Sequence, residues 1–116
     1  MKSTPAVLTA LRVLFWLSVS LGLWLALRPL TGPPPPPGPI DKIEHFTGFY
    51  LLSVMALPAF PTARRWQIFV GLTAFGGLVE LLQAIPFIHR DCDFWDWLTD
   101  MVGIGAALLP TFLRKR

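Results

Sequence analysis

Val7–Leu27, with the sequence VLTALRVLFWLSVSLGLWLAL, decides the fold, because Arg12 is its only charged residue. About 20 apolar residues in a helix cross the hydrocarbon core of a bilayer, since each residue advances about 1.5 Å and the core is about 30 Å thick. Arg12 lies near the start, where a long cationic side chain can reach the headgroups. The stretch therefore predicts a membrane-spanning helix. A signal peptide is the alternative, but the whole stretch is long enough to span a bilayer.

Three further apolar stretches follow, at 43–60, 66–85 and 94–113. The 116 residues are 53% hydrophobic and 15% charged, whereas soluble domains carry about 25% charged residues. A chain this short cannot bury so much apolar surface within itself. The sequence therefore predicts one all-α domain over 1–116, an integral membrane bundle of about four transmembrane helices. The basic residues form short clusters rather than one stripe, so no nucleic-acid partner is expected.

The segment 32–39 separates the first two spans and contains five consecutive prolines. Proline lacks the backbone N–H that a helix interior requires, and successive prolines favour polyproline II. The segment is interpreted as a stiff loop between two helices. A ligand for a proline-binding module is the alternative.

The basic residues predict the orientation of the bundle. With four spans, seven of the ten basic residues lie at the two termini and in the loop between the second and third spans, and three lie on the other side. An excess of Lys and Arg in short loops marks the cytoplasmic face. Both termini are therefore predicted to be cytoplasmic. The seven acidic residues and both histidines lie at or near the opposite ends of the spans, which predicts a polar cluster on the outer side.

The start of the second span carries a candidate acid–base group. Asp41 and His45 are four residues apart and share a helical face, so a carboxylate could orient the imidazole. Asp41 could equally be a residue of a helix start, with Lys42 as an interfacial anchor. At the end of the third span, Glu80 and Gln83 share a face. A carboxylate at membrane depth costs about 2.5–3.5 kcal/mol and normally faces a partner inside the bundle.

In the fourth span, Asp96, Asp100 and Gly103 follow at spacings of four and three, which place them on one helical face. Gly103 and Gly105 allow another helix to approach closely. A bundle would gather eight polar residues at the outer end: Asp41, Lys42, His45, Glu80, Gln83, Arg90, Asp96 and Asp100. His45 and Glu80 are the catalytic candidates, and the other six are candidates for ligand binding. No cofactor is expected, and a metal is left open, because one histidine with scattered acids is no metal signature.

These residues resemble the VanZ-like family of small bacterial membrane proteins. The resemblance covers about 41–109 and joins three motifs, namely Asp41-Lys42-x-x-His45, Glu80-x-x-Gln83, and Arg90 followed by Asp96 and Gly103. Two residues depart from the family pattern: Phe49 stands where tyrosine is common, and Asp100 stands where asparagine is common.

The resemblance implies a multi-pass protein of the bacterial cytoplasmic membrane, in a family whose namesake is linked to teicoplanin resistance. We expect a cell-envelope protein that binds an anionic lipid or lipid-linked cell-wall precursor at the outer face. Chemical modification of that ligand is a further possibility. Lys42 and Arg90 would hold the anion. The alternative is an assembly protein whose polar cluster only locks helix packing, and a small transporter ranks third. The sequence leaves the oligomeric state open.

Overall fold

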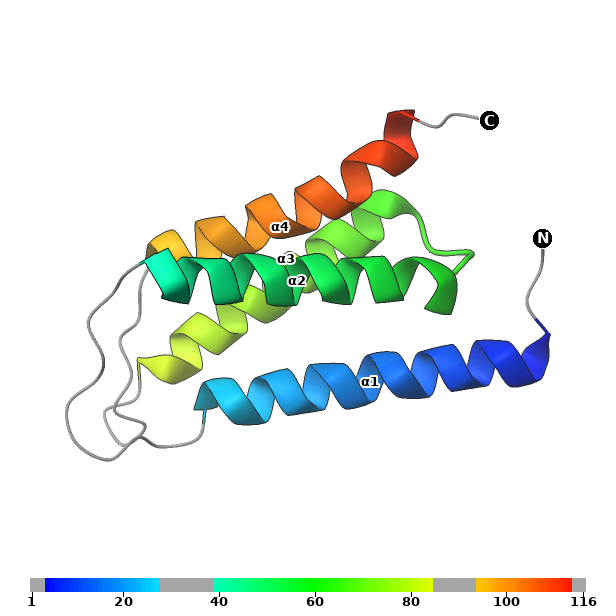
Figure 1. Ribbon diagram of the computed structural model, residues 1–116, viewed down its shortest axis with the longest axis horizontal. Coiled ribbons are helices and arrows are strands. Elements are labelled where there is room, and N and C mark those ends of the chain that lie inside the picture. Colours follow the sequence, from blue (N-terminus) through cyan, green and yellow to red (C-terminus); the bar gives the residue numbers. More distant parts are fainter. Residues whose placement is uncertain (1–3, 28–38, 85–93, 114–116) are drawn as a thin grey trace.

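The computed structural model describes residues 4–27, 39–84 and 94–113. The described residues form four helices and no strand: α1 (Pro5–Leu27), α2 (Pro39–Ala59), α3 (Arg65–Gln83) and α4 (Phe94–Leu113) (Figure 1). The prediction of an all-α chain with four helices is confirmed. α2 begins before the predicted start, at Pro39, because proline fits the first turn of a helix, where no N–H is needed. The rest of the proline-rich segment, 32–38, lies outside the described residues.

Two of the helices, α1 and α3, are long and apolar enough to cross a membrane by length and composition, with mean hydropathies of 1.9 and 1.2. The other two miss that criterion. The polar residues that open α2, such as Lys42 and Glu44, and the aspartates of α4, Asp96 and Asp100, lower the hydropathy of these helices.

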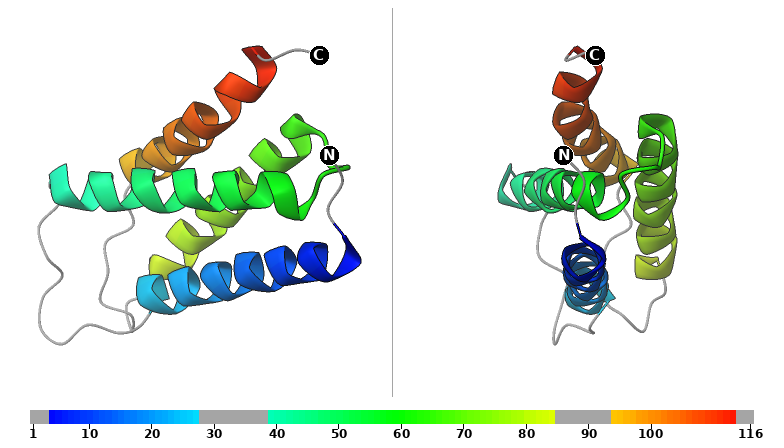
Figure 2. Two further views of the ribbon diagram at one scale, coloured as in Figure 1. Left: turned by 45° about the vertical axis from the view of Figure 1, so that its right-hand side comes forward. Right: turned by 90° about the vertical axis from the view of Figure 1, so that its right-hand side faces the viewer.

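α2 lies between α1 and α4 and makes its most extensive interface with α4, while α3 packs mainly on α4 (Figures 1 and 2). α2 and α4 start at the end of the molecule where α1 and α3 finish (Figure 1). The buried core draws on all four helices and consists of Phe15, Phe49, Ala56, Ala59, Ile68, Leu72, Ile104 and Leu108. α1 supplies Phe15 alone to this buried core, Leu11 and Val19 pack against it, and many of the other large apolar side chains of α1 are exposed.

The interface between α2 and α4 depends on a glycine. A Cβ atom built at Gly103 would lie 2.6 Å from the carbonyl oxygen of Phe46. A carbon and an oxygen cannot approach this closely, so only glycine lets the two backbones touch here. The predicted role of Gly103 in close helix packing is borne out, whereas nothing lies within 4 Å of a Cβ at Gly105.

Two helix ends are closed by side chains from other helices. The last carbonyls of a helix have no N–H partner within it. Arg12 Nε on α1 donates to the Ala59 carbonyl at the end of α2 (2.8 Å), and its guanidinium lies 5.4 Å from the centre of the Phe60 ring. Gln83 Nε2 on α3 donates to the Ala26 carbonyl near the end of α1 (2.9 Å). Arg12 therefore links α1 to the end of α2, whereas the sequence predicted only a contact with lipid headgroups.

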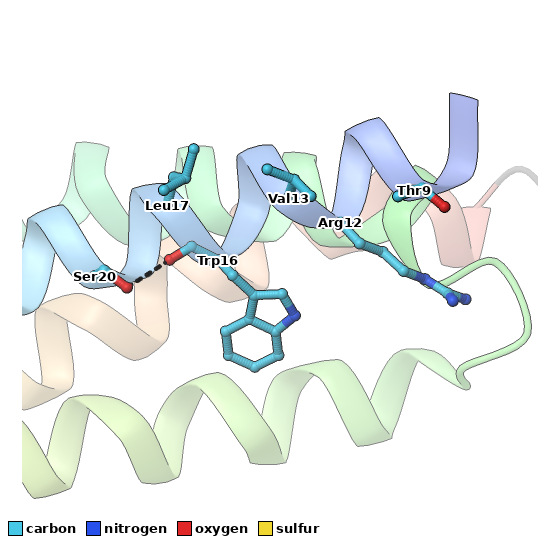
Figure 3. Close-up of a pocket in the computed structure, with 6 residues that line it drawn as sticks. All are labelled: Thr9, Arg12, Val13, Trp16, Leu17 and Ser20. Carbon is cyan, nitrogen blue, oxygen red and sulfur yellow. Dashed lines mark hydrogen bonds between the residues drawn. The ribbon is translucent and has the colours of Figure 1, made fainter. Parts of the chain in front are cut away.

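Figure 3 shows the surface of α1 around this arginine. A pocket is lined there by six residues of α1 alone, namely Thr9, Arg12, Val13, Trp16, Leu17 and Ser20. The Trp16 indole points toward α3, and Arg12 reaches toward the connection between α2 and α3 (Figure 3). Since one helix supplies the whole lining, the pocket is a feature of the outer surface of α1.

Arg12→Ala is expected to loosen α1 from the bundle. The variant loses the bond to Ala59 and the contact with Phe60, and a hydrogen bond from a charged donor contributes about 1.5–3 kcal/mol. We expect a lower melting midpoint of the detergent-purified protein and faster protease cleavage within α1. Thr9→Ala, at an exposed position of the same helix, is the matched control. Equal melting of the two variants would contradict the prediction.

Candidate functional site

The polar side chains of α2 and α4 meet because the two helices start at the same end and cross there (Figure 1). Lys42 and His45 lie one turn apart near the start of α2, and Asp96 and Asp100 lie one turn apart near the start of α4. Each pair occupies one helical face, and the Gly103–Phe46 contact brings the two faces together. The four side chains therefore form one connected group.

His45 is held at both ring nitrogens. Nδ1 lies 2.8 Å from Asp100 Oδ1, and Nε2 lies 3.5 Å from Asp96 Oδ2. An ionised Asp100 accepts a hydrogen bond from the Nδ1–H form of the ring, and the other ring nitrogen faces Asp96. The Asp100 side chain is 1% exposed and that of His45 is 17% exposed. The ring is thus fixed in orientation, with an edge that solvent can reach.

Lys42 neutralises Asp96. Its Nζ atom donates to Asp96 Oδ1 at 2.5 Å, and the side chains are 30% and 6% exposed. The lysine side chain is therefore partly exposed to solvent while it binds a buried carboxylate. Because Asp96 also faces His45, this aspartate links the ammonium group to the imidazole.

Glu80 joins the group from the third helix, α3. His45, Glu80 and Asp100 each offer one ligand atom, and these atoms lie within 4.8 Å of one another. Glu80 is buried, at 5% exposure. One turn earlier on α3, a Cβ at Gly76 would lie 2.8 Å from Asp100 Oδ2 and 3.3 Å from the Phe49 ring. Glycine at 76 thus leaves the space that the Asp100 carboxylate occupies.

The eight predicted site residues divide into three groups. Lys42, His45, Asp96 and Asp100 are in contact, and Glu80 lies beside them. Gln83 is buried but directs its amide nitrogen to α1, at Ala26. Arg90 and the side chain of Asp41 lie outside the described residues. Asp100 contacts the imidazole in the described part of the chain, and the expected role of Asp41 concerns a side chain outside it.

The sequence analysis did not predict two contributions to the site: the space provided by Gly76 and the packing of Phe49. Gly76 precedes Glu80 by four residues and Phe49 follows His45 by four, so each lies one turn from a predicted site residue on the same face. Helical spacing counted from the polar residues would have found both. The Phe49 ring is buried and provides an apolar floor beside the carboxylate of Asp100.

The arrangement can carry two kinds of chemistry. An imidazole oriented by a carboxylate can accept or donate a proton, as a general base or acid. Lys42 and the starts of α2 and α4, which carry the positive ends of the helix dipoles, favour a negatively charged ligand nearby.

Comparisons with known proteins give no match. No family model matches the chain, and neither a curated protein nor a solved structure shows significant similarity to it. The resemblance to the VanZ-like family stays a prediction from three short motifs.

Proposed function

We propose that the chain is a four-span, VanZ-like protein of the bacterial cytoplasmic membrane that binds, and acts by acid–base chemistry on, an anionic lipid or lipid-linked cell-wall precursor. The observation that carries this proposal is His45, fixed by Asp100 and Asp96 beside Lys42 at one end of the bundle. This polar end would lie on the extracytoplasmic side.

The surfaces of α2 and α4 support a membrane location for all four helices. Both helices have about 20 residues, with 21 in α2 and 20 in α4, which suits a bilayer core of about 30 Å. Their buried polar side chains turn inward, toward each other and α3. Large apolar side chains, including Leu51, Val54, Val102 and Leu109, face outward. Inward-facing polar groups behind an apolar exterior are what a bilayer requires of a spanning helix.

The distribution of basic residues supports the orientation. Arg12, Arg64 and Arg65 lie at the end of the bundle away from the polar cluster, and an excess of Lys and Arg marks the cytoplasmic side. Both termini would then be cytoplasmic. The polar cluster would face the extracytoplasmic side, where it could meet the phosphates of outer-leaflet lipids and of lipid-linked wall precursors.

An anionic ligand fits the positive groups of this end. Lys42 is 30% exposed while it binds Asp96, so its ammonium group can also contact a ligand from outside. The starts of α2 and α4 add the positive ends of two helix dipoles. In this assignment His45 moves the proton, Asp100 orients the ring, and Glu80 is the second acid–base group.

His45→Ala and Glu80→Gln are expected to abolish function without lowering the amount of protein in the membrane. The test compares growth of a deletion strain, complemented with each variant, under teicoplanin and other envelope stresses. Membrane abundance is measured in the same cells. Glu44→Gln, an exposed acid on α2 next to His45, is the matched control and should complement fully. Full complementation by both site variants would refute the proposal.

A structural role is the second candidate, and the Lys42–Asp96 bond favours it because this bond ties α2 to α4. In that case the site variants should lose abundance and melting stability in proportion to their loss of function. Normal abundance with lost function would exclude this second candidate, and proportional losses would exclude the first.

A further inference from the structure

His45, Glu80 and Asp100 lie on α2, α3 and α4 and bring three potential ligand atoms to within 4.8 Å of one another. We propose that these three residues bind a divalent transition-metal ion, of the kind that accepts one imidazole and two carboxylates. The inference does not depend on the proposed ligand of the polar end, and in the metal-bound state His45, Glu80 and Asp100 act as ligands instead of acid–base groups.

The distances suit a single ion after a small movement. Ligand atoms about 2.0–2.2 Å from a tetrahedral zinc ion lie about 3.4 Å apart. His45 Nδ1 and Asp100 Oδ1 are already 2.8 Å apart, and the widest separation in the group is within 4.8 Å. Glu80 has two methylene groups between backbone and carboxylate, so rotation of its side chain can close the remaining gap.

The surroundings of His45 match those of a metal-bound histidine. A metal-ligating histidine usually directs its second ring nitrogen to a carboxylate, which fixes the tautomer and the ring orientation. In this chain Nδ1 faces Asp100, and Nε2 faces Asp96 Oδ2 at 3.5 Å. Asp96 is itself held by Lys42. The outer carboxylate that such a site needs is therefore in place, and it comes from a residue outside the ligand set.

The donor set selects the class of metal. Imidazole suits Zn²⁺ and its first-row neighbours, whereas Mg²⁺ and Ca²⁺ prefer oxygen ligands throughout. Three protein ligands also leave a coordination position for water or a ligand, as in catalytic zinc sites. Glycine at 76 supports the proposal because it keeps room beside Asp100 Oδ2 on the face of α3 that carries Glu80.

Binding exchanges a proton for the ion. The imidazolium form of His45, with a hydrogen on each ring nitrogen, loses its Nδ1 hydrogen to the solvent and keeps the Nε2 hydrogen directed to Asp96. Nδ1 and Asp100 Oδ1 then turn to the metal. The two positive charges of the ion then lie between carboxylates that α3 and α4 bury, at 5% exposure for Glu80 and 1% for Asp100. A buried charge is stable only when an opposite charge lies close to it, so the ion should also tighten the three-helix contact.

The test uses the full chain in detergent, stripped with a chelator and titrated separately with Zn²⁺, Mn²⁺ and Mg²⁺. We expect one Zn²⁺ per chain by elemental analysis, a higher melting midpoint with Zn²⁺, and weaker binding of Mg²⁺. Glu80→Gln and Asp100→Asn should each weaken Zn²⁺ binding at least tenfold. Asp96→Asn should weaken it by about tenfold, as expected for a residue that only orients a ligand. Glu44→Gln should bind like the wild type.

Binding of Co²⁺ to the wild type gives a readout that does not depend on the folding of any variant. Nitrogen and oxygen ligands should give visible d–d bands without a thiolate charge-transfer band. A thiolate band would assign the ion to Cys92 and overturn the proposal. It would equally be overturned if the wild type bound no Zn²⁺, if Mg²⁺ bound as tightly as Zn²⁺, or if Glu80→Gln bound Zn²⁺ as tightly as Glu44→Gln.

Discussion

Gly103→Ala is expected to remove most of the folded protein, although it adds one methyl group. The new Cβ would lie 2.6 Å from the carbonyl oxygen of Phe46, and both the Cβ and the oxygen belong to rigid helical backbone. Relief requires α2 and α4 to move apart, which also stretches the Lys42–Asp96 bond. Overpacking of this kind costs about 3 kcal/mol, a large share of the stability of a small domain.

Gly105→Ala is the matched control for this prediction. Both glycines lie on α4, and nothing lies within 4 Å of a Cβ at position 105. Alanine is favoured over glycine in a helix by about 0.5–1 kcal/mol, so Gly105→Ala should melt at or above the wild-type temperature. The measurement is the monodisperse fraction that survives heating in detergent. Similar melting of the two variants would show that the helices do not touch at Gly103.

Lys42→Met is expected to be the second most disruptive substitution. It leaves the Asp96 carboxylate, with a side chain 6% exposed, without the ammonium group that now binds it. Breaking a buried ion pair from one side costs about 3–5 kcal/mol, and the 30% exposure of Lys42 reduces this figure. We expect a loss of about 2 kcal/mol, seen as a lower melting midpoint and reduced membrane abundance.

The double variant Lys42→Met/Asp96→Leu tests the reason for that loss. Replacing both partners with apolar residues removes the stranded charge, and such replacements are often neutral or stabilising. The double variant should therefore melt at a higher temperature than Lys42→Met alone. If the double variant melted at the lower temperature, the destabilisation would come from lost packing of the lysine stem rather than from the unpaired, buried charge of Asp96.

The helices were predictable because their apolar stretches are long and bounded by proline or charged residues. The bounds of α4, 94–113, agree with the prediction, and those of α1 differ by two residues at the start. The inward face of α4 was also predictable. The spacing of Asp96, Asp100 and Gly103 places them on one face, and all three contact α2 in the structure.

The pairing of residues across helices could not be predicted. Arg12 and Gln83 bind backbone carbonyls at Ala59 and Ala26, and a carbonyl acceptor leaves no trace in the sequence because every residue has one. The sequence predicted that His45, Glu80 and Asp100 lie at the same end of the bundle, but how close they come depends on the crossing of three helices. Residues 35 and 55 positions apart along the chain meet there, and no spacing rule applies at such separations.

A site assembled from α2, α3 and α4 also constrains the order in which it can form during synthesis. The ribosome releases Lys42, His45 and Glu80 before it completes α4, so the partners of these residues on α4 do not yet exist. A nascent chain has to keep its polar side chains hydrated, or shielded by a chaperone, until Asp96 and Asp100 arrive. The site therefore forms only after α4 has docked on α2 and α3. A quality-control protease could recognise chains in which α4 has not docked.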